Sequence, residues 1–282
     1  MMNRRDAIKT WLSLVAGGTT LGFADQPKPE SPTDLVAPPP EHEAMHAMPR
    51  GWLGNETIGI LMYPKFTALD LFGPHHIFIS MAGAKVLLVA KTPDPVATDT
   101  GVKIQPTTTF ADCPEKLSIL FVPGGTTGTL EAALDKDTRE FVADRGEKAE
   151  WVTSVCTGSL ILGAAGLLEG YQATSHWMTR DSLKEFGAVP VNRRVVVDRN
   201  RVTGAGVTSG LDFALQLLKD IRGKDYAETV QLFSEYDPRP PLDCGTPEKA
   251  PKEMLKLLED MFAPFGKQVT EMAREVRAAR AN

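Results

Sequence analysis

The stretch that decides the fold is Trp151-Val-Thr-Ser-Val-Cys156-Thr-Gly-Ser-Leu160, which continues in small and apolar residues to Leu168. Residues 151–155 form a short apolar run typical of a buried parallel strand, and the pattern over 157–168 predicts a helix. Cys156 lies at the junction between the two. In an open α/β sheet such a junction is a sharp elbow, which exposes its side chain at the carboxyl edge where ligands bind.

The chain from residue 56 onward repeats this alternation of strand and helix. Apolar runs predict strands at 57–63, 85–90 and 117–122, and a β-ribbon at 194–203 that turns at Asn200. Helical patterns occupy, in whole or in part, 67–81, the segment ending at Leu134, 138–148, 208–221 and 226–235. Regular alternation of this kind predicts an α/β sandwich around a mostly parallel sheet.

The first 24 residues differ from this body. Arg4, Arg5 and Lys9 form a basic patch ahead of an uncharged stretch that ends at Ala24. That stretch is shorter than the roughly 20 residues of a membrane-spanning helix. The layout resembles a twin-arginine signal and predicts a protein exported to the periplasm, with no stable membrane insertion. An uncleaved anchor or a chance basic start, with the protein in the cytoplasm, is the alternative.

The other segments follow from composition. Residues 25–55 read as a linker, because 27–50 contain seven of the 21 prolines and proline favours an extended tether over a packed core. Residues 56–246, which carry the strand and helix alternation, are then expected to form the main folded domain. Residues 247–282 carry many charges with apolar residues at helical spacing, which predicts one or two helices packing on the body or on a partner.

Charge and cysteine content exclude two classes of protein. The formal charge is −5 and the sequence pI is about 5.6, and an acidic surface repels phosphate backbones, so nucleic acid is not an expected partner. Three cysteines are too few for a disulfide scaffold. His42 and His46 lie four residues apart in the linker; they suit a borderline metal or are simply solvated.

Cys156 is the candidate nucleophile. The free N–H groups and the positive dipole end of the following helix are expected to favour the thiolate and to lower the pKa of this cysteine. Gly158 and Ser159 follow shortly after it, and these small residues let a substrate approach. The alternative is a buried cysteine that packs as a small apolar side chain, which suits a strand interior better than a strand-to-helix junction.

Asp70 is the candidate proton partner of the thiol. It lies among apolar residues at the start of the helix that follows the first strand. Burial and a neighbouring thiolate would raise the pKa of its carboxyl, so that it can hold and donate a proton. The alternative is a helix N-cap aspartate. The loop Pro123-Gly124-Gly125-Thr126-Thr127 reaches the same sheet edge, where its N–H groups either stabilise negative charge or merely form a turn.

Together these motifs resemble the ThiJ/PfpI superfamily and, within it, the isonitrile hydratase subfamily. The similarity covers about residues 56–250, and its matching stretches are 69–75, 109–114, 121–125, 153–159, 162–168, 173–177, 203–214 and 236–241. This resemblance implies a flavodoxin-like fold, also called class I glutamine amidotransferase-like, in a three-layer sandwich. It implies hydration of organic isonitriles to N-substituted formamides by a homodimer that uses no metal or organic cofactor.

The resemblance also assigns roles to individual residues. It implies Cys156 as nucleophile, Asp70 as its carboxyl partner and Thr157 beside them. We expect Gly124, Gly125 and Val207 to bind the substrate. Many superfamily members carry glutamate where this chain, like the hydratases, has Asp70. Ala205 departs from the pattern, because it stands in a glycine-rich turn near the Cys156 helix.

Two other functions stay open from the sequence. His176 could pair with the cysteine in an amidase or glyoxalase-like hydrolase, although the hydratase pattern contains a histidine here without using it as a base. Alternatively, the protein is a non-catalytic exported module in which Cys156 senses oxidation. Cys113 and Cys244 could form a disulfide in an oxidising compartment, or Cys113 could be structural.

Overall fold

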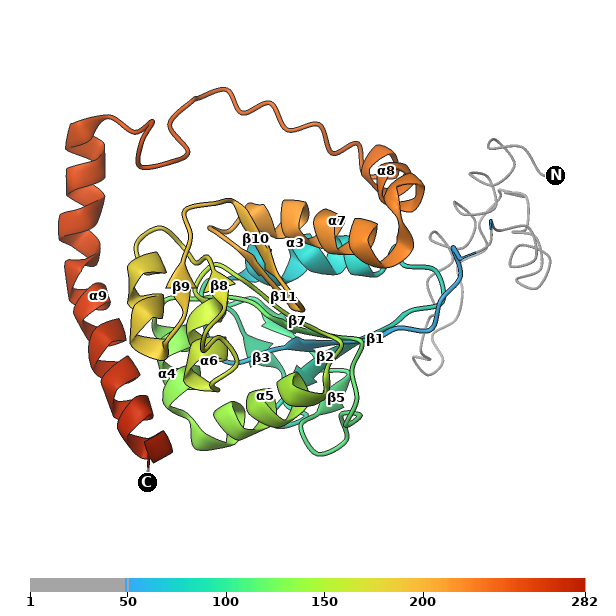
Figure 1. Cartoon of the computed structure of the whole chain (residues 1–282), viewed down its shortest axis with the longest axis horizontal. Coiled ribbons are helices and arrows are strands. Elements are labelled where there is room, and N and C mark those ends of the chain that lie inside the picture. The colour runs from blue at the N-terminus through green and yellow to red at the C-terminus, as the bar shows by residue number, and fades with distance from the viewer. Residues whose placement is uncertain (1–48, 50, 282) are drawn as a thin grey trace, which may run out of the picture.

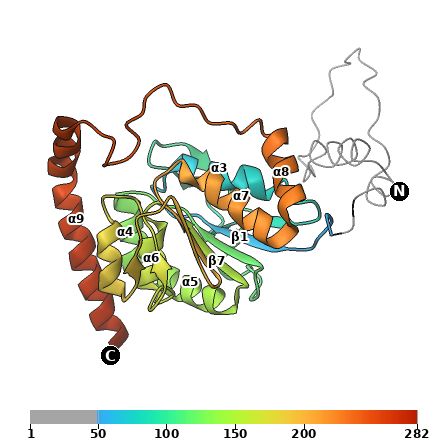
Figure 2. The ribbon, with the colours of Figure 1, turned by 45° about the horizontal axis from the view of Figure 1, so that its top comes forward.

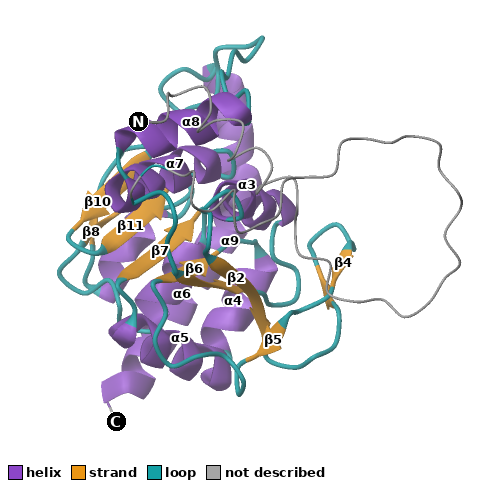
Figure 3. Ribbon diagram, turned by 90° about the vertical axis from the view of Figure 1, so that its right-hand side faces the viewer, coloured by secondary structure: helices purple, strands orange, loops and turns teal. Residues whose placement is uncertain are grey.

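A seven-stranded sheet forms the middle layer of the molecule (Figure 1). The structure is a computed structural model that describes residue 49 and residues 51–281. Figure 3 shows the strands crossing the molecule from β10 to β5. Their order is β10 (Val195–Asp198), β11 (Arg201–Gly204), β7 (Trp151–Val155), β6 (Ile119–Val122), β1 (Thr57–Leu61), β2 (Lys85–Ala90) and β5 (Thr108–Thr109).

Helices cover both faces of this sheet (Figure 2). One face carries α3 (Ala68–Phe78) and α7 (Ser209–Arg222), with α8 (Lys224–Phe233) packed on α7. The other face carries α4 (Thr127–Leu134), α5 (Lys136–Lys148) and α6 (Gly158–Ala164). This arrangement confirms the predicted flavodoxin-like three-layer sandwich.

All neighbouring strands of the sheet are parallel except β10, which pairs antiparallel with β11. The predicted ribbon is therefore the outermost hairpin of the sheet. β6 is buried along its whole length, and β7 along all but its first residue, because helices cover both of their faces. Their apolar runs end together at the carboxyl edge, which brings the loop at 123–125 beside Cys156.

Smaller elements complete the body. A hairpin of β3 (Val96–Ala97) and β4 (Lys103–Ile104) follows β2, and a short parallel pair joins β8 (Gln172–Ala173) to β9 (Val189–Pro190) around the 3-10 helix η1 (Arg180–Phe186). Several predicted elements extended too far: the first strand ends at 61 and the helix after Cys156 ends at 164. Gly166, at φ 84°, lies just beyond that helix and suits a helix end better than its interior.

The C-terminal segment is a single helix, α9 (Lys252–Ala281), although Pro264 lies within it. It packs against η1, α4 and α6 through its second half, where Val269, Met272 and Val276 are buried. No helix in the described part of the chain is long and apolar enough to cross a membrane. The predicted signal at 1–24 and the pair His42 and His46 lie outside the described residues.

Candidate active site

Cys156 occupies the turn between β7 and α6, as the sequence predicts. Its φ is 56°, a left-handed conformation that is costly for a residue with a side chain and that is enriched at functional sites. Its backbone N–H is held by the carbonyls of Ala205, at 2.6 Å, and Gly204, at 3.2 Å. The residue is 6% exposed. Backbone hydrogen bonds from β11 therefore hold this strained turn in place.

Asp70 lies in the first turn of α3 and is fully buried. The residue before this helix is Thr67, so Asp70 is not the N-cap. Its Oδ2 accepts a hydrogen bond from the backbone N–H of Gly124 at 3.0 Å. Its Oδ1 is buried and, within the described structure, has no hydrogen-bond partner. Such an orphaned carboxyl oxygen costs free energy and points to a functional role.

The loop after β6 holds the two candidate catalytic groups together. Gly124 donates to Asp70, and the backbone N–H of Gly125 donates to Thr157 Oγ1 at 2.9 Å. A Cβ on Gly124 would lie 2.7 Å from Asp70 Oδ2 and 2.8 Å from Cys156 Cβ, so the carboxyl and the cysteine flank this glycine. Both N–H groups thus bind protein atoms. Direct binding of substrate by Gly124 and Gly125 stays a prediction.

A buried group of hydroxyls extends this arrangement. The oxygens Thr157 Oγ1 and Thr129 Oγ1 lie 2.8 Å apart, and both hydroxyls donate to the carbonyl of Gly125. The Tyr63 hydroxyl donates to the carbonyl of Pro123 at 2.8 Å and lies 3.2 Å from Thr129 Oγ1. Three separate elements therefore fix the position of the 123–125 loop, and with it the Asp70 carboxyl.

The surroundings of Asp70 raise the pKa of its carboxyl from 3.8 to about 7. Burial is the main cause, and the negative charge of Asp99 adds to it. The hydrogen bond from Gly124 acts in the opposite direction, as does the nearby Cys156 thiol. The prediction of a raised pKa is confirmed, but the like charge comes from Asp99 and not from a neighbouring thiolate. A carboxyl of this kind can both accept and donate a proton near neutral pH.

The predicted lowering of the Cys156 pKa is wrong. Burial raises the pKa of this thiol well above its usual value, and the Asp70 charge raises it further. Hydrogen bonding from Thr157 favours the thiolate but is a smaller effect. The helix N-terminus therefore does not outweigh the loss of water around the sulfur. The resting pair is a thiol beside a carboxyl, and the two titrate as a unit.

The remaining predicted residues lie around this pair. Val207 is half-buried in the turn after β11, next to the carbonyls that hold Cys156. His176 packs against Gly206 in the same turn, its Nδ1 accepts from the Met178 N–H at 3.4 Å, and burial lowers its pKa. None of the hydrogen bonds described for His176 reaches Cys156.

No group of three or more metal-binding side chains gathers among residues 51–281. All three cysteines are free thiols, so the alternative of a Cys113–Cys244 disulfide is not present in this structure. Cys113 is buried and Cys244 is exposed.

Comparison with known proteins places this geometry in a family. The DJ-1/PfpI family model matches residues 56–220. The chain belongs to the DJ-1/PfpI family. It is 46% identical over 221 residues to the isonitrile hydratase of Pseudomonas putida, covering 78% of this chain and 96% of that protein.

Solved structures agree with this family assignment. A ThiJ/PfpI family protein from Pseudomonas syringae is 52% identical, with a TM-score of 0.79 over 81% of this chain and 98% of that one. DJ-1beta of Drosophila melanogaster is 19% identical, with a TM-score of 0.58 over 64% of this chain and 98% of that chain, and shares the fold alone.

Sequence reasoning missed three residues of this DJ-1/PfpI site: Tyr63, Asp99 and Thr129. Each lies on a different element from Cys156 and shows no recognisable spacing from it. The signal was weak. Tyr63 ends the predicted strand 57–63 and Asp99 follows the predicted strand 85–90, and such ends converge at the carboxyl edge of a parallel sheet, whereas Thr129 lies in the helix predicted to end at Leu134. The contacts of Tyr63 and Thr129 with the 123–125 loop, and the effect of the Asp99 charge on Asp70, depend on packing that a linear pattern does not contain.

Replacing Gly124 with alanine tests how closely the site is packed. Its backbone conformation suits any residue, so the obstacle is space: the added methyl meets Asp70 Oδ2, Thr157 N and Cys156 Cβ within 2.8 Å. We expect a loss of about 1–3 kcal/mol in unfolding free energy and an altered rate of Cys156 alkylation by iodoacetamide. Gly245→Ala is the control, because nothing lies within 4 Å of its added methyl. Unchanged alkylation and stability in Gly124→Ala would contradict this geometry.

Proposed function

We propose that this protein is an enzyme that hydrates organic isonitriles to N-substituted formamides, with Cys156 as nucleophile and Asp70 as proton carrier. The observation that carries the proposal is the buried Asp70 carboxyl, held by Gly124 with one oxygen free, beside a strained Cys156. The 46% identity to the isonitrile hydratase of Pseudomonas putida supports the substrate class.

In the first half of the reaction, the sulfur of Cys156 attacks the terminal carbon of R–N≡C. Because its pKa is raised, Cys156 enters the reaction as a thiol and must lose its proton. That proton passes to the Asp70 carboxylate as the C–S bond forms. The resulting carboxylic acid then protonates the same carbon. The product is a thioimidate, R–N=CH–S–Cys156, and Asp70 is again a carboxylate.

In the second half, water attacks the thioimidate carbon. Asp70 takes a proton from the water and passes it to the nitrogen, which gives a tetrahedral adduct with N–H and O–H groups and leaves Asp70 as a carboxylate. Collapse of this adduct breaks the C–S bond, releases R–NH–CHO and returns the thiol. The sum is one isonitrile plus one water, so the proposed cycle needs no oxidant or reductant.

The deciding experiment is an assay of the purified protein against a panel of alkyl and aryl isonitriles. Loss of the isonitrile stretch in the infrared spectrum, with matching formation of formamide by mass spectrometry, would support the proposal. No turnover of any member by a folded protein whose Cys156 reacts with iodoacetamide would refute it.

Substitution of His176 separates this reaction from a cysteine–histidine hydrolase. We expect His176→Ala to keep its isonitrile activity within roughly tenfold of the wild type, since general-base residues usually contribute 10²–10⁴-fold. The reason is that burial lowers the His176 pKa and its Nδ1 already accepts from the Met178 N–H. A loss comparable to that of a Cys156 variant, measured as kcat/KM, would favour the hydrolase.

A role as oxidation sensor has less support from the structure. Peroxide reacts with the thiolate of an accessible cysteine, whereas Cys156 is 6% exposed and its pKa is raised. Mass spectrometry after mild peroxide, run beside the isonitrile assay, distinguishes the two. A sulfenic acid without turnover would favour the sensor.

We also propose that the active form is a homodimer. The first half of α9 carries an exposed apolar stripe, formed by Met254, Leu257, Leu258 and Met261. These residues recur at helical spacing on the side of α9 that Val269 and Met272 continue into the body, yet they are exposed, which is uncommon for an apolar stripe without a partner. Two antiparallel copies of the stripe would pair Met254 with the partner's Met261, and Lys256 with the partner's Glu259.

The stripe predicts the effect of a single charge. Leu257→Glu should convert the dimer to a monomer, because it buries a carboxylate in an apolar contact. Light scattering coupled to size exclusion measures the mass. Arg274→Glu, on the exposed side of the second half of α9, is the control and should leave the mass unchanged. A dimer that survives Leu257→Glu would show that another surface forms the interface.

A further inference from the structure

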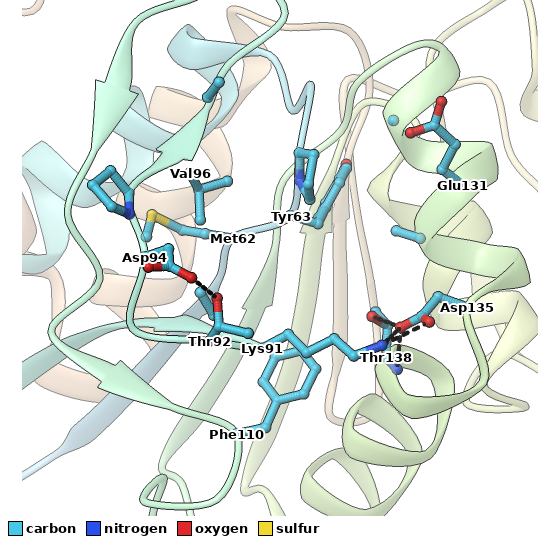
Figure 4. A pocket seen from close by; sticks show the side chains of 16 residues that line it. Met62, Tyr63, Lys91, Thr92, Asp94, Val96, Phe110, Glu131, Asp135 and Thr138 are labelled. Carbon is cyan, nitrogen blue, oxygen red and sulfur yellow. Dashed lines mark hydrogen bonds and ion pairs between the residues drawn. The ribbon is translucent and has the colours of Figure 1, made fainter.

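A cavity lies along the same edge of the sheet as Cys156, beyond the ends of β1 and β2 (Figure 4). Its volume is about 570 Å³, within the range of sites for small organic molecules. It opens between the β3–β4 hairpin and the helices α4 and α5. Neither Cys156 nor Asp70 lines it, so the proposed catalytic groups lie outside it, although it shares Tyr63 with the site described above.

The floor of the cavity is apolar. Met62, Tyr63, Val96 and Ala132 are each at most 9% exposed and lie around it. Phe110 forms one wall and is held by stacking on Phe141, with ring centroids 4.1 Å apart. A preformed apolar floor with an aromatic wall binds the hydrocarbon part of a small molecule.

The rim of the cavity is acidic. Lys91 Nζ lies 2.9 Å from Asp135 and 2.7 Å from Asp137, so two carboxylates share one ammonium group. Glu131 pairs with Lys65 at 2.6 Å. Figure 4 shows Lys91 extended toward Asp135, with Asp94 on the opposite side of the opening.

Among the carboxylates of the rim, Asp94 is the one that this arrangement leaves available to bind a cationic ligand. Its Oδ2 accepts a hydrogen bond from the Thr92 hydroxyl at 3.2 Å, and no ion pair of Asp94 occurs within residues 51–281. The rim therefore carries more negative than positive charge, which attracts cations and repels carboxylates.

Hydrogen bonds join the floor of the cavity to the catalytic loop. Tyr63 lines the cavity, and its hydroxyl contacts Thr129 Oγ1 and the carbonyl of Pro123. Thr129 in turn contacts Thr157 and the carbonyl of Gly125. A molecule packed against Tyr63 can thus shift the group of hydroxyls that positions Asp70 and Cys156.

We propose that this cavity is a second small-molecule site, which binds an organic ammonium compound with an apolar body, and that its occupancy changes the reactivity of Cys156. The apolar floor takes the hydrocarbon part, and the ammonium group lies at the rim near Asp94. The proposal does not depend on isonitrile hydration, because both binding and thiol reactivity are measured without turnover.

Calorimetry of the full chain with benzylammonium tests the binding. We expect saturable binding that is tighter than that of benzyl alcohol, and none of benzoate. Ala132→Phe fills the cavity and should abolish binding, whereas Ala143→Phe, on α5 outside this cavity, should not. Asp94→Asn changes charge without volume, and should weaken benzylammonium binding by roughly threefold while leaving benzyl alcohol unaffected.

Two results would overturn the site. One is the absence of saturable benzylammonium binding by the folded wild-type protein. The other is equal binding by the wild type and by a folded Ala132→Phe. If Ala132→Phe does not fold, the Asp94→Asn comparison decides alone, with Asp181→Asn, an exposed acid on η1, as its control.

The link to Cys156 has its own measurement. Saturating benzylammonium should change the rate of Cys156 alkylation by iodoacetamide at fixed pH, and Thr129→Val should reduce that change because it removes the hydroxyl that Tyr63 contacts. Equal alkylation rates with and without saturating ligand would overturn the coupling.

Discussion

Cys156→Ala should lower isonitrile hydration by roughly 10⁴-fold or more, because removal of a covalent nucleophile removes the step that all later steps require. The variant should keep its fold. The side chain removed is small, and the main-chain hydrogen bonds of residue 156 to Gly204 and Ala205 do not involve the sulfur. Formamide production under single-turnover conditions and near-UV circular dichroism measure the two properties.

Cys113→Ala is the matched control for this prediction. Cys113 is the other buried cysteine, and burial also raises its pKa, but its backbone carbonyl contacts Arg145 and it lies outside the catalytic loop. We expect full activity in this variant. Formamide production at the wild-type rate by Cys156→Ala would refute the covalent mechanism, whatever the behaviour of Cys113→Ala.

The central strands and the elbow were predictable from sequence because they depend on local pattern. β7 is an apolar run that stops at a cysteine followed by small residues, and each part of that pattern has a direct structural cause. Even the ribbon of β10 and β11 follows from two short apolar runs around Asn200. Element ends were less predictable. Gly166 has a left-handed conformation just beyond the end of its helix, whereas Pro264 lies within α9 without ending it.

The candidate site was predictable as a list of residues but not as an electrostatic environment. The sequence places Cys156 at a helix N-terminus, which on its own lowers a thiol pKa. The sequence does not show how deeply the sulfur is buried or that a buried carboxyl faces it, and these two effects prevail. Likewise, the sequence suggests that the N–H groups of Gly124 and Gly125 are free to bind a substrate. In the folded protein they donate to Asp70 and Thr157.

Asp70→Asn should lower kcat/KM by roughly 10²–10⁴-fold, the usual contribution of a proton-transfer group, and should change its pH dependence. In the reactive form, the pair of Cys156 and Asp70 carries one proton, on the thiol. In the wild type, activity should therefore rise as pH passes about 7, where the Asp70 carboxyl ionises, and fall at a pH above the usual thiol range. Asparagine does not ionise, so the rising limb should vanish.

Asp99→Asn serves as the control for this pH profile. Asp99 raises the Asp70 pKa by its charge without contacting the sulfur, so its neutralisation should move the rising limb to lower pH and leave a limb in place. A rising limb near pH 7 that persists in Asp70→Asn would assign that ionisation to another group.

Asp70→Asn should also stabilise the fold at alkaline pH. The Asp70 pKa is about 7 in the folded protein against an ordinary 3.8, so the folded state holds its proton more tightly than the unfolded chain. As pH rises through this interval the unfolded chain loses its proton first, and the wild type loses stability, up to about 4 kcal/mol above pH 7. Asp70→Asn escapes this loss, because asparagine carries no charge to bury.

Urea unfolding of both proteins at pH 5 and pH 8 measures this effect. The stability gained by Asp70→Asn should be larger at pH 8 than at pH 5, while its activity is low at both. That combination distinguishes a catalytic carboxyl from a structural one. Removal of a structural carboxylate held by favourable contacts would destabilise the fold. A difference in stability that does not vary with pH would show that Asp70 is not buried with a raised pKa, and the proton transfers assigned to it would lose their basis.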